Sequence, residues 1–184
     1  HPDELAPTDI AEYAVTVLRK SHIKEIYLLG RRGPAQAAFT NPEIKELCEL
    51  RGCDLVVDPK EMDLDAVSKE SLAKGEGGPK AKKNVDILNE QSKKGRGVQP
   101  RKIIVRNLVS PVEIIGKDGR VEALKLEKNM LVRAEDGTIK AKGAGQYEIL
   151  PVGLVFRSVG YKGVALPGLP YDSRKGTIPN EFGR

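Results

Sequence analysis

The sequence has few of the residues from which metal sites, reactive thiols and disulfide frameworks are built. Its 184 residues include two cysteines, two histidines and no tryptophan. Cys48 and Cys53 form no CxxC pair, and neither His1 nor His22 lies at zinc-ligand spacing from them. We therefore expect no metal site and no catalytic thiol. Such sparse cysteine also favours a cytoplasmic protein.

Long apolar runs are absent as well. No stretch approaches the roughly 20 apolar residues of a membrane-spanning helix, and the first residues lack the apolar segment of a secretion signal. Charge, by contrast, is plentiful: 31% of the residues are charged and the formal net charge is +5. This balance is typical of a globular protein with an aliphatic core, and its sign favours anionic partners.

Helical and strand-like patterns alternate in the first third of the chain, which is typical of an α/β fold with parallel strands. Thr8 is expected to cap the first helix, Gly30 to end the first strand and Pro42 to open the second helix. The pattern predicts helices over about residues 9–20 and from Asn41 to Gly52, and buried strands over residues 23–29 and 53–58.

The rest of the chain has a different composition. Residues 73–101 are rich in glycine and lysine around a helical patch at 85–88, and they predict a mobile, charged surface segment. Two β-rich runs follow, over residues 101–132 and 145–161, with turn signals at Asp118-Gly119 and Asp136-Gly137. The expected fold class is therefore α/β, with parallel strands and helices followed by an antiparallel β-meander.

An arginine pair follows the first predicted strand. Arg31 and Arg32 lie between Gly30 and Gly33, with no acidic residue nearby. In a dinucleotide-binding fold the residues after the second strand distinguish NAD from NADP, and the strand before Gly30 would correspond to that second strand. An acidic residue there selects NAD, whereas arginines hold the 2′-phosphate of NADP through bidentate, permanently charged contacts. The plain alternative is a pair of solvated arginines at a strand end, and no glycine precedes Gly30 to form a pyrophosphate-binding loop.

Three segments resemble the NADP-binding domain of the adrenodoxin reductase-like ferredoxin-NADP reductases: GRRGPAQAAFTNPEIKEL, LPVGLVFRSVGYKGVALPGLPYD and GTIPN. The resemblance extends over residues 1–184. It implies a partial Rossmann-like NADP-binding domain that lacks its first strand and Gly-rich loop, with the FAD domain outside this chain. The implied enzyme is a flavoprotein that transfers hydride between NADPH and FAD and exchanges electrons with ferredoxin, and this chain alone is expected to be inactive.

The resemblance also implies the site residues. Arg31 and Arg32, flanked by Gly30 and Gly33, would bind the 2′-phosphate of NADP. Glu46 would be the catalytic acid near nicotinamide and flavin. Its neighbour Glu43, one turn earlier, is an alternative for that role, and a solvated helix face is the plain alternative for both acids.

Several alternatives stay open at the level of sequence. The chain could be a non-catalytic binding or assembly module, which would be indifferent to the arginine pair. Arg157 could lie at a domain interface or in a structural ion pair. The basic residues from Lys74 to Arg106 have no interleaved aromatics, so we expect a solvated face or a dock for acidic ferredoxin and no nucleic-acid binding. The missing strand would leave strand edges open, so we expect the chain either to self-associate through those edges or to rearrange part of the sheet.

Overall fold

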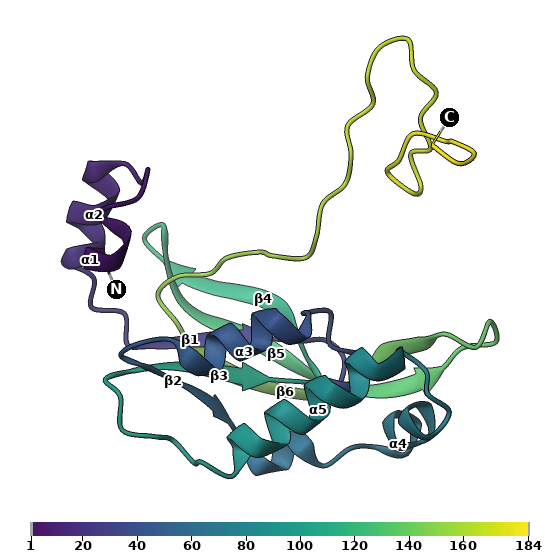
Figure 1. Cartoon of the computed structure of the whole chain (residues 1–184), viewed down its shortest axis with the longest axis horizontal. Coiled ribbons are helices and arrows are strands. Elements are labelled where there is room, and N and C mark those ends of the chain that lie inside the picture. The colour runs from purple at the N-terminus through teal and green to yellow at the C-terminus, as the bar shows by residue number, and fades with distance from the viewer. Residues whose placement is uncertain (1, 184) are drawn as a thin grey trace.

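The chain forms two three-stranded sheets, one composed of β1, β3 and β2 and the other of β4, β5 and β6 (Figure 1). The computed structural model describes residues 2–183, so His1 lies outside the described range. Within that range no helix is long and apolar enough to cross a membrane. The architecture confirms the expected mixture of a parallel α/β part and an antiparallel meander.

The parallel sheet contains β1 (Glu25–Leu29), β2 (Cys53–Val57) and β3 (Arg101–Arg106) in the order β1-β3-β2. Both pairings are parallel, and Ile103 is level with Ile26 on one side and Leu55 on the other. The positions of the two strands predicted in the first third of the chain are thus confirmed, and β2 is buried as expected. The expectation that β1 is buried was wrong, because it lies at a sheet edge with Ile26 and Leu28 exposed. The two strands form the two edges of this sheet, and a strand from much later in the sequence lies between them.

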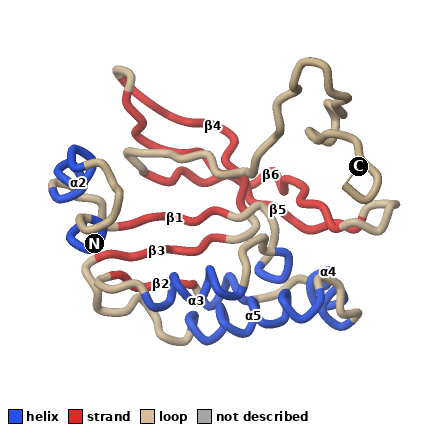
Figure 2. Tube along the Cα trace, turned by 45° about the horizontal axis from the view of Figure 1, so that its top comes forward, coloured by secondary structure: helices blue, strands red, loops and turns tan. Residues whose placement is uncertain are grey.

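Helices α3 (Asn41–Glu49) and α5 (Gly78–Ser92) lie side by side next to β2 and β3 (Figure 2). Their contact with the sheet buries an aliphatic core composed of Ile44, Leu55, Val57, Ile87, Leu88, Ile103 and Val105. The capping chemistry of α3 explains its start: the Thr40 hydroxyl accepts from the Glu43 amide, and the Glu43 carboxylate accepts from the Thr40 amide. The helix ends at Glu49, three residues before Gly52.

The helical patch predicted at residues 85–88 is confirmed, but it is part of a longer helix, and the prediction of a mobile segment over residues 73–101 was wrong because α5 occupies most of it. One side of this helix is buried and the other carries the lysines, so the composition concealed an amphipathic helix. Asn84, at its centre, is fully buried. Its amide donates to the Phe39 carbonyl (3.0 Å), and its side-chain oxygen accepts from Asn41 (2.6 Å).

The N-terminal residues form two short helices, α1 (Pro2–Leu5) and α2 (Glu12–Arg19), which stand beside the sheets (Figure 1). The expected cap at Thr8 was wrong: its hydroxyl donates to the Leu5 carbonyl (2.6 Å), so Thr8 closes the turn after α1. Helix α2 begins at Glu12 and has Ala11 at its N-cap position. Three further short elements complete the helical part, namely η1 (Pro34–Gln36), η2 (Pro59–Met62) and α4 (Ala66–Ala73).

The meander consists of β4 (Val109–Lys117), β5 (Arg120–Arg133) and β6 (Ile139–Pro151), paired antiparallel in that order. The first predicted turn is confirmed, since Asp118 and Gly119 both have positive φ (50° and 73°), as a type I′ hairpin requires. The second predicted turn joins β5 to β6, with Gly137 at a φ of +78°.

Past β6 the Val152 amide donates one further hydrogen bond to the Glu122 carbonyl (3.1 Å), and the rest of the second β-rich run is unpaired, so this part of the prediction was wrong. Residues 152–161 leave the meander in an extended path (Figure 2). Their pattern is strand-like, but a strand forms only where a neighbour accepts its backbone hydrogen bonds. Phe156 and Val159 consequently remain 84% and 79% exposed.

Candidate nucleotide-binding site

The loop after β1 lies at the junction of the two sheets. The Gly30 amide donates to the Arg106 carbonyl at the end of β3 (2.8 Å), and the Gly30 carbonyl accepts from the Val109 amide at the start of β4 (3.1 Å). A side chain at Gly30 would place its Cβ 3.4 Å from the Asn107 side-chain oxygen. This is an ordinary van der Waals distance, so the two backbone hydrogen bonds, and not lack of space for a side chain, fix Gly30 between the sheets.

Both arginines of the pair are anchored through their backbone. The Arg32 carbonyl accepts from the Leu108 amide (3.2 Å), and the Arg31 carbonyl accepts from the Asn129 side chain (2.9 Å). Leu108 has a φ of +54°, a left-handed conformation that is uncommon for leucine. The guanidinium groups are exposed and form no ion pair with any residue in the range 2–183. The backbone is thus fixed while two positive charges remain free.

Gly33 allows a close approach. A Cβ at this position would lie 3.1 Å from the Gln36 side-chain oxygen and 3.4 Å from the Ser68 hydroxyl, which join η1 to α4. Gly33 has an ordinary φ of −76°, so lack of space, and not backbone conformation, favours glycine here. Gly30 and Gly33 therefore shape the path of the loop on either side of the arginines.

The next residues of the loop are fastened to the start of α5. The Lys80 ammonium donates to the Ala38 carbonyl (2.8 Å), and the Asn41 amide donates to the Lys80 carbonyl (3.1 Å). The buried Asn84 binds the Phe39 carbonyl one turn further along the helix. We call residues 30–40 the arginine loop. The start of α5, which was expected to be part of a mobile segment, thus holds the second half of this loop in place.

A pocket of about 430 Å³ opens beside Arg32. Its size lies within the range of small-molecule sites, roughly 300–1,000 Å³. Three parts of the fold contribute its walls: the η1 loop, the region from α4 to the start of α5, and the β5–β6 turn. The lining residues are Arg32, Ala35, Gln36, Ala37, Ser71, Glu76, Gly77, Lys80, Ala81, Gly137, Thr138 and Ile139. A larger hollow, of about 970 Å³, is lined only by residues 179–182 of the tail, and it gathers no cluster of charge.

The structure does not bring Glu46 to this pocket. The Glu46 side chain is exposed on α3, and its carboxylate forms no hydrogen bond or ion pair with any residue in the range 2–183. Glu43 lies one turn earlier and is already engaged: hydrogen bonds from the Thr40 amide and hydroxyl lower the pKa of its carboxyl, with the nearby Lys80 charge adding to the effect. Neither Glu46 nor its alternative Glu43 therefore lines the pocket beside Arg32.

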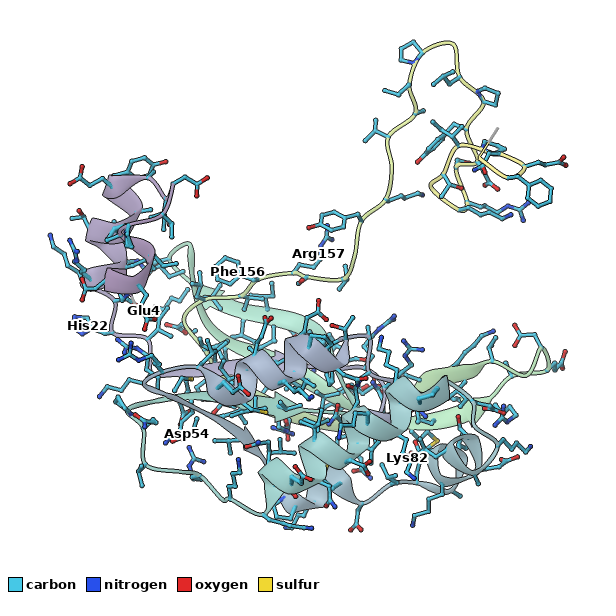
Figure 3. The ribbon with its side chains drawn as sticks, viewed as in Figure 1. Glu4, His22, Asp54, Lys82, Phe156 and Arg157 are labelled. Atoms are coloured by element: carbon cyan, nitrogen blue, oxygen red, sulfur yellow. The ribbon has the colours of Figure 1, made fainter. Side chains whose placement is uncertain are left out.

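Arg157 lies on the extended chain after β6, next to Phe156 (Figure 3). It is exposed, and no residue of the described range forms an ion pair with it. The structural ion pair considered for Arg157 is thus not observed.

The described residues contain no group of three or more histidine, cysteine or acidic side chains that could hold a metal ion. The two cysteines are half-buried, and burial raises the pKa of both thiols. The Cys48 thiol donates to the Ile44 carbonyl (3.1 Å). Both side chains therefore favour the neutral thiol, which is a poor nucleophile.

Two residues of this region were missed at the sequence level. Asn129 is 98 residues from Arg31 in the chain, and only the pairing of β5 with β4 brings it to the loop. Lys80 was treated as one of many surface lysines because the start of α5 was not predicted. The helical spacing of its buried residues, from Ala81 through Asn84 to Leu88, was the signal that could have located it.

A parallel sheet with an exposed arginine pair at the carboxyl end of a strand, beside a pocket, is the arrangement expected of a nucleotide-binding α/β unit. No protein-family model matches the chain. It is 46% identical to NADPH-ferredoxin reductase FprA of Mycobacterium tuberculosis (strain ATCC 25618 / H37Rv) over 183 residues, covering 100% of this chain and 39% of that protein. Mitochondrial NADPH:adrenodoxin oxidoreductase of Homo sapiens is 34% identical over 193 residues, covering 100% of this chain and 38% of that protein.

Solved structures give the same result. The structure of Mycobacterium tuberculosis FprA in complex with NADPH matches the whole chain with a TM-score of 0.87 and 45% identity, and the chain covers 39% of it. The chain thus spans about two-fifths of the length of the relatives it matches. Over that part, the resemblance to the adrenodoxin reductase-like ferredoxin-NADP reductases is confirmed.

Proposed function

We propose that this chain is the NADP(H)-binding portion of a flavin-dependent ferredoxin-NADP reductase. The observation that carries the proposal is the match of the whole of this chain, in sequence and in fold, to 39% of a reductase whose structure was solved in complex with NADPH. In the whole protein, bound FAD would exchange a hydride, which carries two electrons, with NADPH and would exchange electrons one at a time with ferredoxin. FAD and ferredoxin are assigned to the whole protein and to no residue of this chain.

The arginine pair supports recognition of the 2′-phosphate of NADP. Arg31 and Arg32 present two guanidinium groups that no acid within residues 2–183 neutralises, and both carbonyls are anchored. Guanidinium groups match phosphate oxygens in charge and in donor geometry. Gly30 and Gly33 would act through the path of the loop. The residues present therefore fit NADP, and the discrimination against NAD would reside in this loop.

We further propose that residues 1–184 form a Rossmann-like NADP-binding domain, with its first strand and Gly-rich loop supplied elsewhere in the whole protein. The edge position of β1 supports this, because a further strand could pair there. Glu46 is proposed as the acid near the nicotinamide, its support being the motif that follows the arginine pair. A cytoplasmic location is proposed from the sparse cysteine content.

The test of nucleotide recognition is calorimetric titration of the chain with 2′,5′-ADP and, separately, with 5′-AMP. We expect tighter binding of 2′,5′-ADP, and we expect Arg31→Ala/Arg32→Ala to remove that preference, with a loss of at least about 100-fold if each charged contact contributes as such contacts usually do. Equal affinity for both ligands, unchanged in the double variant, would instead favour a binding or assembly module without nucleotide recognition.

The activity of the whole protein needs its own test. Flavin reduction in the intact protein, followed by stopped-flow absorbance, should be much faster with NADPH than with NADH. The double arginine variant should reduce that difference mainly through the apparent affinity for NADPH. A rate that is the same for both nucleotides would contradict the proposed specificity.

A further inference from the structure

The pocket beside Arg32 has a second cation in its wall. Lys80, in the first turn of α5, comes from a part of the chain almost fifty residues beyond the arginine pair, yet both Lys80 and Arg32 line the same space. Arg32 and Lys80 are both exposed, and neither forms an ion pair with any residue of the described range. Two positive charges therefore face one pocket.

The acid of the pocket does not neutralise these cations. Glu76 is the one carboxylate in its wall, and it pairs with Arg133 on β5, whose guanidinium nitrogen lies 3.1 Å from the Glu76 oxygen. That hydrogen bond lowers the pKa of Glu76, so the carboxylate is charged and already partnered. The pocket as a whole retains a positive balance, and such a balance favours an anionic ligand.

The Lys80 ammonium has a defined position. It donates to the Ala38 carbonyl (2.8 Å) in the loop that follows the arginine pair. An ammonium group has three donors, and this bond uses one of them. The Lys80 charge also lowers the pKa of Glu43, which lies in the first turn of α3 but outside ion-pair distance. Lys80 is therefore held over the arginine loop with donors left for a ligand.

We propose that Lys80 is a specificity-determining residue for the 2′-phosphate of NADP, acting on it together with Arg32, which lines the same pocket. This inference rests on the proposed function, which assigns that phosphate to the arginine loop. Lys80 adds a compact, strongly hydrated charge to the planar guanidinium groups. Its contribution should consequently appear in affinity for the phosphorylated ribose and should weaken with added salt.

The experiment measures affinity for 2′,5′-ADP and 5′-AMP by calorimetry with wild type, Lys80→Gln and Lys80→Arg. Glutamine keeps a donor for the Ala38 carbonyl but removes the charge, whereas arginine keeps the charge. Lys82→Gln is the matched control, because Lys82 lies on the same helix (Figure 3) but does not line the pocket. Thermal melting of each variant checks that the fold is kept.

We expect Lys80→Gln to weaken 2′,5′-ADP binding by about 10-fold, as loss of one charged hydrogen bond does. Binding of 5′-AMP should stay within about two-fold, and Lys80→Arg should retain most of the affinity for 2′,5′-ADP. The inference is overturned if Lys80→Gln leaves 2′,5′-ADP binding unchanged, weakens both ligands equally or has the same effect as Lys82→Gln.

Failure of the proposed function would look different. In that case the wild-type chain would show no preference for 2′,5′-ADP, or the arginine double variant would keep the preference, and the inference about Lys80 would fall with it. If wild type prefers 2′,5′-ADP and loses the preference only with Arg31 and Arg32, the function stands and the role of Lys80 alone is refuted.

Discussion

The Arg106 guanidinium donates a 2.7 Å hydrogen bond to the Glu148 carboxylate, which joins the parallel sheet to the meander. Arg106 ends β3, and Glu148 lies on β6. The same guanidinium donates to Glu61 on η2 (3.0 Å), and the Glu61 carboxylate also accepts from the Asn107 amide (2.6 Å). The Arg106 carbonyl in turn accepts from Gly30. The arginine loop thus starts at the point where the two sheets are tied together.

Arg106→Met should destabilise the chain by about 2 kcal/mol, because the half-buried Glu61 and Glu148 lose their shared partner. Urea denaturation followed by circular dichroism measures the change in the free energy of unfolding. Lys140→Met, which breaks an exposed pair with Asp136, is the control and should cost less than about 0.5 kcal/mol. Equal effects of the two variants would contradict a specific role for the junction.

Glu61 should give the stability a distinct pH dependence. Burial raises the pKa of its carboxyl above 4.5, outweighing the Asn107 amide and the Arg106 charge, which lower it. A raised pKa in the folded state means that the stabilising contribution is complete below about pH 4.5 and is lost as the pH rises through the folded value.

Relative to Glu61→Gln, the wild type should therefore lose free energy of unfolding as the pH rises through that window. Urea titrations of both proteins at several pH values measure the difference. Glu46→Gln serves as the control, since its carboxylate is exposed on α3. A difference that grows in the opposite direction would show that the ion pair with Arg106 outweighs burial.

Asn129 should act as a positioning residue for the arginine pair. Its side-chain amide donates to the Arg31 carbonyl (2.9 Å) and to the Ser110 hydroxyl (2.8 Å). Asn129→Asp replaces this donor by an acceptor of the same shape and adds a negative charge beside the arginine pair, so we expect at least about five-fold weaker binding of 2′,5′-ADP, the loss of roughly one neutral hydrogen bond together with the added repulsion. Calorimetry should show little change for 5′-AMP. The exposed Asn89→Asp is the control, and an equal loss for both ligands would indicate a general structural role.

The open edge of the parallel sheet predicts self-association of the chain. The core between the sheet and helices α3 and α5 contains side chains of β2 and β3. Ile26 and Leu28, on the edge strand β1, remain 51% and 41% exposed. Size-exclusion chromatography with light scattering should show a concentration-dependent dimer or larger species. Ile26→Lys/Leu28→Lys should shift the chain to monomer, and Ile114→Lys on β4 should not. A clean monomer of wild type at all concentrations would contradict the prediction.

Local signals were sufficient where a structure depends on neighbouring residues. Short apolar runs ended by Gly30 and Pro59 located β1 and β2, and the Asp118-Gly119 pair located the first hairpin. Each of these depends on burial or on turn conformation within a few residues. The arginine pair could likewise be selected from the sequence as a candidate phosphate-binding site, because it directly follows a predicted strand.

Long-range partners explain the parts that were not predicted. Only residues 85–88 of helix α5 were predicted as helical, because glycines and lysines flank that patch in the sequence, although Leu88 and Asn84 are fully buried against other elements. Threonine is a common N-cap residue, but the Thr8 hydroxyl donates to the Leu5 carbonyl at the end of α1 and does not cap α2. The run after β6 has strand residues without a neighbouring strand. Lys80 and Asn129 reach the loop only through tertiary packing, which no local pattern specifies.

The most direct test of the central claim compares two ligands of equal charge, 2′,5′-ADP and 3′,5′-ADP, titrated calorimetrically into the wild-type chain. If Arg31 and Arg32 recognise the 2′-phosphate, 2′,5′-ADP should bind at least about 10-fold more tightly, since only that isomer places both charged contacts correctly. The double alanine variant should bind the two isomers alike. Equal affinity of the wild type for both isomers would show that the loop attracts negative charge without reading the 2′ position, and the assignment of the arginine pair would be wrong.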